Sequence, residues 1–195
     1  MKTLIILLLG FVGFFSFSFA IDQIKEYTID PDFTLTIKGT SNVHDWQSSV
    51  EELNGSTTAT ISEDGYLKID ACNISIPVMK IKSEKGSIMD KKTRKALDEK
   101  TYPNIEYSLS EFESAKLSQS TFKSQTSGEL TVAGVQKAID MELEGRVLPD
   151  SSIEISGSVE LKMTDFNIEP PTALLGAMKT GDDITIEFKI KLSNS

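Results

Sequence analysis

The sequence has few of the residues that most catalytic and metal sites need, with one cysteine and one histidine among 195 residues. The single cysteine, Cys72, cannot form an internal disulfide, and we expect a buried, unreactive thiol because it follows a strand-like run. The single histidine, His44, excludes two-histidine metal sites and, with one cysteine, His/Cys/Cys zinc sites. Gly-rich phosphate loops and the Gly-x-Ser-x-Gly elbow are also missing. We therefore expect no metal, no cofactor and no enzyme; catalysis by His44 with a distant serine stays open as an alternative.

Basic residues are in the minority, because 20 Lys and Arg stand against 29 Asp and Glu, giving a net charge of −9. Such an acidic chain argues against a nucleic-acid partner, since proteins that bind nucleic acids neutralise phosphates with basic side chains. It also gains nothing from anionic lipid headgroups, so we expect any membrane contact to depend on something other than charge. With 39% apolar and 25% charged residues, the chain is neither disordered nor fibrous.

Charge is missing altogether from residues 4–20. This stretch follows Met1-Lys2, is apolar over residues 4–15, and ends in Ser18-Phe19-Ala20, whose small residues suit a signal-peptidase site. It falls short of the ~20 apolar residues of a spanning helix, which is the alternative interpretation. We therefore predict a signal peptide over residues 1–20 and a mature domain over residues 21–195. That domain would be periplasmic or secreted, with no integral membrane anchor after cleavage.

Most of the mature chain alternates apolar and polar residues with a period of two. The clearest runs are residues 33–37 and 184–192, and each predicts a strand with one buried and one solvated face. Further runs of this kind cover residues 56–62, 66–76, 104–112, 129–132, 138–147 and 153–163. Turn signals such as Asn54-Gly55 and Asp64-Gly65 separate consecutive runs. We therefore expect eight or nine antiparallel strands.

One segment departs from this alternation. Residues 87–90 resemble a helix capping box, and residues 91–100 are rich in helix formers and stop before Tyr102-Pro103. We predict one short helix, with one stripe formed by Ile88, Met89, Lys92, Ala96 and Leu97. The remaining all-β sheet must close into a barrel or fold into a sandwich. Long strands after residue 135 and the missing Cys-Trp-Cys framework favour a barrel of about eight strands over an immunoglobulin sandwich.

Two features could form the mouth of a cavity in such a barrel. His44 and Trp46 have the same parity on one strand and project to the same side, whereas Asp45 points away. They form either a core aromatic with its polar partner or the polar tip and aromatic wall of a ligand cavity. Residues 168–178 are too broken by proline for a central strand and too apolar for a solvated loop. They either plug the barrel or cover its opening as a lid.

Several motifs follow one another along the chain in a fixed order. They are Gly39-Thr40-Ser41-Asn42-Val43-His44-Asp45-Trp46, Ile76-Pro77-Val78 leading to Lys82-Ser83, Met89-Asp90 opening a helix that ends at Tyr102-Pro103-Asn104-Ile105-Glu106-Tyr107, residues 128–135, and residues 161–168 followed by Pro170-Pro171. The ordered set resembles the YceI-like family of exported lipid-binding proteins, from Tyr27 onward. The resemblance implies an extended lipocalin-like antiparallel barrel of about eight strands, with a helix against it. It also implies a long apolar channel able to hold a polyisoprenoid chain such as a quinone tail.

Strand parity and this resemblance together predict which residues line the cavity. The candidates are Phe33, Leu35, Ile37, His44, Trp46, Leu67, Ile69, Ile88, Met89, Leu97, Ile105, Tyr107, Phe166, Leu174, Leu175, Ile184, Ile186 and Phe188. The favoured function is non-catalytic binding, carriage or storage of an apolar chain ligand, namely a polyisoprenoid, an isoprenoid quinone or another lipid. The alternative is an exported structural or stress-response barrel with a filled interior and no ligand.

Overall fold

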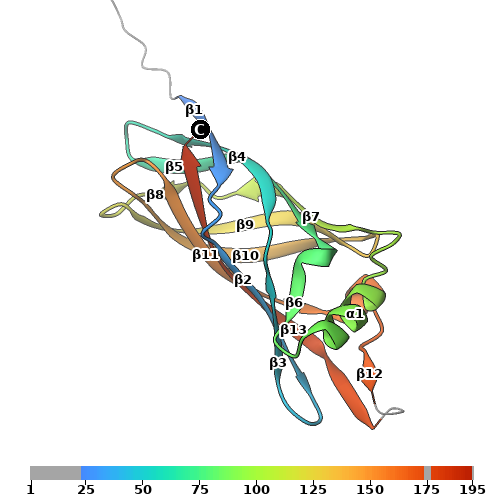
Figure 1. The fold of residues 1–195 in the computed structure, drawn as a ribbon. Coiled ribbons are helices and arrows are strands. Elements are labelled where there is room, and N and C mark those ends of the chain that lie inside the picture. Colours follow the sequence, from blue (N-terminus) through green and yellow to red (C-terminus); the bar gives the residue numbers. More distant parts are fainter. Residues whose placement is uncertain (1–22, 174–176, 195) are drawn as a thin grey trace, which may run out of the picture.

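The structure is a computed structural model that describes residues 23–173 and 177–194 (Figure 1). The predicted signal peptide over residues 1–20 lies outside the described residues, and so do the candidates Leu174 and Leu175. The described chain is built mainly from strands, as the alternating pattern predicts, and carries one α-helix.

Among the described residues, eight strands close into an antiparallel barrel. In order around the barrel they are β1 (Ile24–Ile29), β4 (Asn54–Ile61), β5 (Tyr66–Pro77), β7 (Asn104–Phe112), β9 (Thr121–Val132), β10 (Val135–Val147), β11 (Ile153–Lys162) and β13 (Met178–Asn194). The pairing of Tyr27 in β1 with Asn194 in β13 closes the sheet. The predicted antiparallel barrel of about eight strands is therefore confirmed.

Three of these strands continue into further strand segments at one end of the barrel. β2 (Thr34–Ser41) extends β1 after a break and pairs with β13, and β3 (Trp46–Val50) precedes β4 and pairs with β2. β6 (Ile81–Ser83), which follows β5 after the 3-10 turn η1 (Val78–Lys80), pairs with β3. Within the described chain β6 has no strand on its other side. The sheet is therefore interrupted between β6 and β7.

The helix α1 (Ser87–Ala96) lies across this interruption and packs against β6 (Figure 1). Gly86 is its N-cap, with a φ of 81°, and the Asp90 carboxylate accepts a 2.8 Å hydrogen bond from the Ser83 N–H. The predicted capping box at residues 87–90 is wrong, because Ser87 is already helical and Asp90 binds the end of β6 instead. A single short helix against the barrel is confirmed, although it ends at Ala96 rather than near Lys100.

Side chains fill the interior of the barrel at the end where β1 meets β13. Leu67 and Ile153 are completely buried there, and Tyr27 is 2% exposed. The rings of Phe112 and Phe122 meet edge to face, with centroids 6.5 Å apart. β8 (Ala115–Lys116) pairs with the start of β5 at this same end. This packing closes one end of the barrel, whereas a cavity extends from it toward α1.

Candidate functional site

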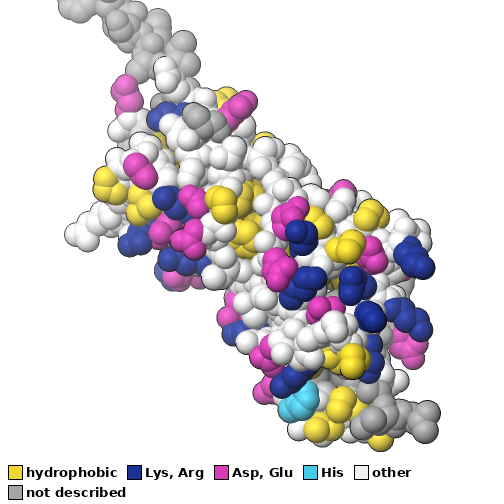
Figure 2. Space-filling model, viewed as in Figure 1, with side chains coloured by type: hydrophobic (Ala, Val, Ile, Leu, Met, Phe, Trp, Pro, Cys, Tyr) yellow, Lys and Arg dark blue, Asp and Glu magenta, His cyan; other side chains and the backbone are white. Residues whose placement is uncertain are grey.

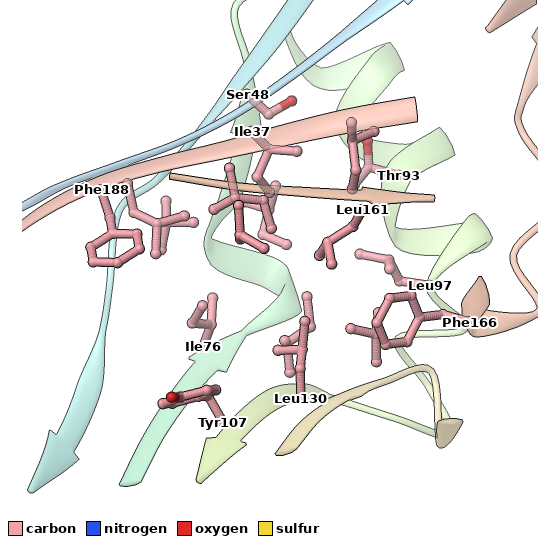
Figure 3. A pocket seen from close by; sticks show the side chains of 18 of the residues that line it. Ile37, Ser48, Ile76, Thr93, Leu97, Tyr107, Leu130, Leu161, Phe166 and Phe188 are labelled. Carbon is pink, nitrogen blue, oxygen red and sulfur yellow. The ribbon is translucent and has the colours of Figure 1, made fainter. Parts of the chain in front are cut away.

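A cavity of about 540 Å³ runs inside the barrel from the packed end toward α1 (Figure 3). Every second residue of β13 from Ile184 to Leu192 lies in its wall. These eight residue steps correspond to about 27 Å of strand, so the cavity is elongated. Its volume lies within the range of ligand pockets, which is about 300–1,000 Å³.

Thirteen of the predicted site residues lie in the wall of this cavity. They are Leu35, Ile37, His44, Trp46, Ile69, Met89, Leu97, Ile105, Tyr107, Phe166, Ile184, Ile186 and Phe188. They come from β2, the β2–β3 turn, β3, β5, β7, β13, the helix with its C-cap residue Leu97, and the 3-10 turn η2 (Met163–Phe166). The strand parity deduced from alternation therefore brings together most of the candidates that the structure describes.

Three other candidates do not lie in the wall, each for a different reason. Leu67 has the expected inward parity but belongs to the packed end, beyond the cavity. Phe33 lies in the break between β1 and β2, where strand parity does not apply, and packs against the larger core cluster. Ile88 is 72% exposed, because α1 turns Met89, Thr93 and Ala96 toward the cavity and leaves Ile88 on its outer face.

Sequence reasoning missed the wall formed by the middle strands. It consists of apolar side chains from β5, β7, β9, β10 and β11: Ile74, Ile76, Leu109, Leu130, Val132, Ile139, Met141, Leu143, Ile155, Val159 and Leu161. Their alternation is visible in the sequence, for example at residues 139, 141 and 143. Alternation shows that one face is apolar, but only the register of the closed sheet shows how far the cavity extends along that face.

Glycines on the inner face leave room for aromatic side chains to lie against the wall. The indole of Trp46 lies over Gly39, its neighbour across β2 and β3, where a Cβ atom would overlap the ring. Its Nε1–H donates a 3.0 Å hydrogen bond to the Thr40 carbonyl oxygen. The ring of Phe188 lies over Gly157 in the same way. Both aromatic rings are therefore part of the cavity wall and lie directly against the backbone of a neighbouring strand.

The few polar groups deep in the wall are uncharged. The Thr57 hydroxyl donates a hydrogen bond to the Cys72 Sγ over 3.4 Å, and burial raises the pKa of the Cys72 thiol. Burial likewise raises the pKa of the Tyr107 hydroxyl. Both groups are therefore protonated at neutral pH, as expected for an unreactive thiol, and the deep cavity carries no charge.

The cavity opens between the β2–β3 turn, the loop before α1 and the start of β13. The residues around this mouth are Ser41, His44, Lys85, Lys92, Pro171, Met178 and Thr180. β12 (Thr172–Ala173) pairs with the start of β13 to form a hairpin at the mouth (Figure 1). The Asn42 side chain holds this hairpin, donating to the Ala177 carbonyl oxygen and accepting from the Lys179 N–H, both over 2.9 Å.

The predicted plug or lid covers residues 168–178, of which the structure describes residues 168–173 and 177–178, and these lie beside the mouth. Ile168 is buried in the smaller core cluster, and Pro171 and Met178 lie in the cavity wall. The described part of the segment therefore combines packing against the core with a position at the opening.

His44 lies at the rim of the mouth with its side chain exposed. Its Nδ1 lies 2.8 Å from the Asp45 carbonyl oxygen, and the Ser41 hydroxyl donates its proton to the His44 carbonyl oxygen over 2.7 Å. Ser41 is therefore not activated by the imidazole.

Over residues 23–173 and 177–194, no group of three or more His, Cys, Asp or Glu side chains could hold a metal ion. Nor does that part of the chain contain a helix with the length and apolarity needed to span a membrane.

Comparisons with known proteins agree with this geometry. The family model described as the YceI-like domain matches residues 27–192. A polyisoprenoid-binding domain from Saccharophagus degradans, implicated in plant cell wall breakdown, superposes with a TM-score of 0.64 at 14% identity, covering 87% of this chain and 98% of that one. Burkholderia cenocepacia BcnA superposes with a TM-score of 0.63 at 16% identity, with 84% and 98% covered. The Campylobacter jejuni YceI protein gives 0.60 at 18% identity, with 96% and 94% covered. No curated protein matches the sequence.

Proposed function

This chain belongs to the YceI-like family, and we propose on that premise that it binds an apolar chain ligand inside its barrel and carries or stores it without catalysis. The ligand class we propose is a polyisoprenoid, an isoprenoid quinone or a related lipid. The observation that carries the proposal is the elongated cavity, whose deep wall is apolar and uncharged. A similar barrel from Saccharophagus degradans is described as polyisoprenoid-binding.

The magnitude of apolar burial supports such a ligand. Each buried methylene contributes about 0.8 kcal/mol, offset by the cost of association and ordering. At about 0.3 kcal/mol per heavy atom, a chain with roughly 30 enclosed atoms has a binding free energy of about −9 kcal/mol. This value corresponds to a sub-micromolar dissociation constant. No hydrogen bond is required for this affinity. The cavity also argues against the alternative of a structural barrel with a filled interior, because filling by side chains would leave no such space.

We further propose that the protein acts outside the cytoplasm, in the periplasm or after secretion. The support is the sequence of residues 1–20, which has the basic start, apolar run and small-residue end of a cleaved signal peptide. Such a compartment is filled with water and lies next to a membrane. An apolar chain is insoluble there, so it can leave the bilayer only when a protein encloses it.

Solvent extraction of the purified protein tests the binding function. Protein isolated from its native host is extracted into organic solvent, and the extract is analysed by mass spectrometry. We expect an apolar chain molecule in a nearly stoichiometric amount. Ligand-free protein should in turn take up an added isoprenoid quinone. An empty extract, together with no uptake of the quinone, would favour the structural barrel and overturn the proposal.

A further inference from the structure

The positive charge of the chain is concentrated in one segment next to the mouth. Residues 80–100, which form β6, the following loop and α1, contain eight Lys and Arg against four Asp and Glu, within a chain whose net charge is −9. Figure 2 shows dark blue side chains gathered on the side of the molecule where α1 lies. The expectation that a membrane contact depends on something other than charge was drawn from the net charge, which takes no account of this local concentration.

Most of these cations are free of ion pairs. In the segment, Lys80 lies 2.8 Å from a Glu52 carboxylate oxygen and Lys85 lies 3.6 Å from one of Glu84. The other six cations have no carboxylate within 4.0 Å in the described part of the chain: Lys82, Lys91, Lys92, Arg94, Lys95 and Lys100. By contrast, seven of the other eleven Lys and Arg described by the structure have such a partner. The positive field beside the mouth is thus only partly neutralised.

The outer face of α1 combines this charge with an exposed apolar side chain. Ile88, Lys91 and Lys95 are spaced three and four residues apart, so they share one face of the helix. Ile88 is 72% exposed, and Lys91 and Lys95 are exposed as well. Across the mouth, Val43 in the β2–β3 turn is 61% exposed next to His44. Two large apolar side chains, one on the outer face of α1 among lysines and one in the β2–β3 turn, are therefore exposed to solvent.

We propose that this face, formed by the outer side of α1 and the β2–β3 turn, docks on an anionic phospholipid bilayer. Basic side chains near such a surface are attracted to its headgroups, and exposed apolar side chains insert at the headgroup boundary. Asp45, at the β3 end of this turn, and Glu84 line a surface hollow beside β3, so the proposed contact is limited to α1 and the part of the turn that carries Val43. Docking would turn the opening of the cavity toward the bilayer. A ligand could then pass between the bilayer and the cavity without crossing water. This consequence rests on the proposed function.

Flotation with lipid vesicles tests the docking face. Protein from the exported fraction is mixed with vesicles of equal parts phosphatidylglycerol and phosphatidylcholine, and with vesicles of phosphatidylcholine alone. We expect binding to the anionic vesicles at low ionic strength, loss of this binding at high salt, and no binding to the neutral vesicles. The double substitution Lys91→Glu with Lys95→Glu should weaken binding at least about 25-fold, because each lysine near an anionic surface is worth about a five-fold change.

A matched control has the same total charge but changes the far end of the barrel. Lys25 in β1 and Lys116 in β8 lie at the packed end, and the double substitution Lys25→Glu with Lys116→Glu should leave vesicle binding within about two-fold. Ile88→Gln should weaken binding several-fold without changing the salt dependence. Equal losses in the two double variants, or no binding of the unchanged protein to anionic vesicles, would overturn the proposal.

The outcome for docking is separate from that for ligand binding. Solvent extraction reports whether the cavity holds an apolar chain, and flotation reports whether the face binds a bilayer. A protein that yields a lipid but does not float refutes docking alone. A protein that floats but yields no lipid and takes up no quinone refutes the proposed function alone.

Discussion

At the scale of the residue, Trp46 is an internal probe of the cavity. It is the single tryptophan of the chain, it lies in the cavity wall, and its indole is held between Gly39 and the Thr40 carbonyl oxygen. We expect an isoprenoid quinone to quench its fluorescence saturably, because a quinone bound in the cavity lies within contact or transfer range of the indole. Titration of the quinone into ligand-free protein measures this effect.

A saturated chain of the same length serves as the control for the Trp46 titration. It should shift the emission to the blue with little quenching, because it removes water from the ring but accepts no electron. If binding is shown by extraction and neither molecule changes the emission, the ligand does not reach the part of the wall next to Trp46.

A second expectation at this scale concerns two neighbours on β13. Ile186 faces the cavity, whereas Glu187 faces solvent and forms a 2.6 Å ion pair with Lys38. Ile186→Lys should cost several kcal/mol or abolish ligand uptake, because it places an unpaired ammonium in an apolar wall. Glu187→Lys should cost at most about 1 kcal/mol, the usual value of an exposed ion pair. Urea unfolding and quinone uptake measure both effects, and equal losses would mean that the assigned faces of β13 are wrong.

At the scale of the element, the inner glycines keep the cavity wide. A Cβ atom at Gly157 in β11 would stand 2.7 Å from the Phe188 ring and 3.1 Å from a Leu143 methyl carbon. Gly157→Ala should therefore push the ring into the cavity, lowering the unfolding free energy by about 1–3 kcal/mol and reducing quinone uptake. Ser158→Ala, on the exposed face of the same strand, should change neither quantity. Unfolding in urea and a binding titration compare the two variants, and equal behaviour would contradict the packing described for Gly157.

The helix shows which parts of an element the sequence determines. Its existence and approximate position follow from local helix formers and the proline after it, and both are confirmed. Its rotation does not follow, because the predicted stripe contains both Ile88, which is exposed, and Met89, which lies in the cavity wall. The packing of α1 on β6, with Asp90 bound to the Ser83 N–H, is a tertiary contact that the helical period alone cannot give.

At the scale of the whole molecule, closure of the barrel was predictable but the extent of its cavity was not. Alternation predicts the inward faces of Leu35, Ile37 and residues 184–192 correctly because it is a local property, whereas Phe33 lies before β2 begins. The packed end depends on the pairing of Tyr27 with Asn194, which joins the two ends of the described chain, so Leu67 was misplaced although its parity was correct. Net charge is likewise a sum over the whole chain, so it does not show that basic residues are concentrated in the segment over residues 80–100.

The stability of the whole barrel should depend on its hydrogen-bonded carboxylates. Asp182 in β13 accepts hydrogen bonds from the Thr164 hydroxyl (2.6 Å) and the Thr164 N–H (2.9 Å), which hold its pKa below the usual value. A hydrogen bond from the Asp32 N–H lowers the pKa of Asp30. A hydrogen bond from the Arg146 guanidinium likewise lowers the pKa of Glu154. A carboxyl group with a lowered pKa in the folded state stabilises that state above its unfolded pKa of about 4, and this contribution disappears as the pH falls through the folded pKa. We therefore expect a nearly constant urea midpoint between pH 8 and about 5 and a decline below about 4.5.

The variant Asp182→Asn isolates one contribution to this decline. An amide keeps an oxygen that can accept from Thr164 but has no charge to lose, so its contribution to stability does not change with pH. At neutral pH the unchanged protein should be the more stable of the two, since a charged acceptor makes the stronger hydrogen bonds. As the pH falls below the unfolded pKa of about 4, the unfolded chain binds a proton at Asp182 more readily than the folded protein does, so the difference between the urea midpoints of the two proteins should shrink. Ser158→Ala, which changes no titratable group, should follow the unchanged protein at every pH. A constant difference between the urea midpoints of Asp182→Asn and the unchanged protein from pH 7 to pH 3 would contradict this expectation. The hydrogen bonds between Asp182 and Thr164 would then gain no stability from the charge of the carboxylate.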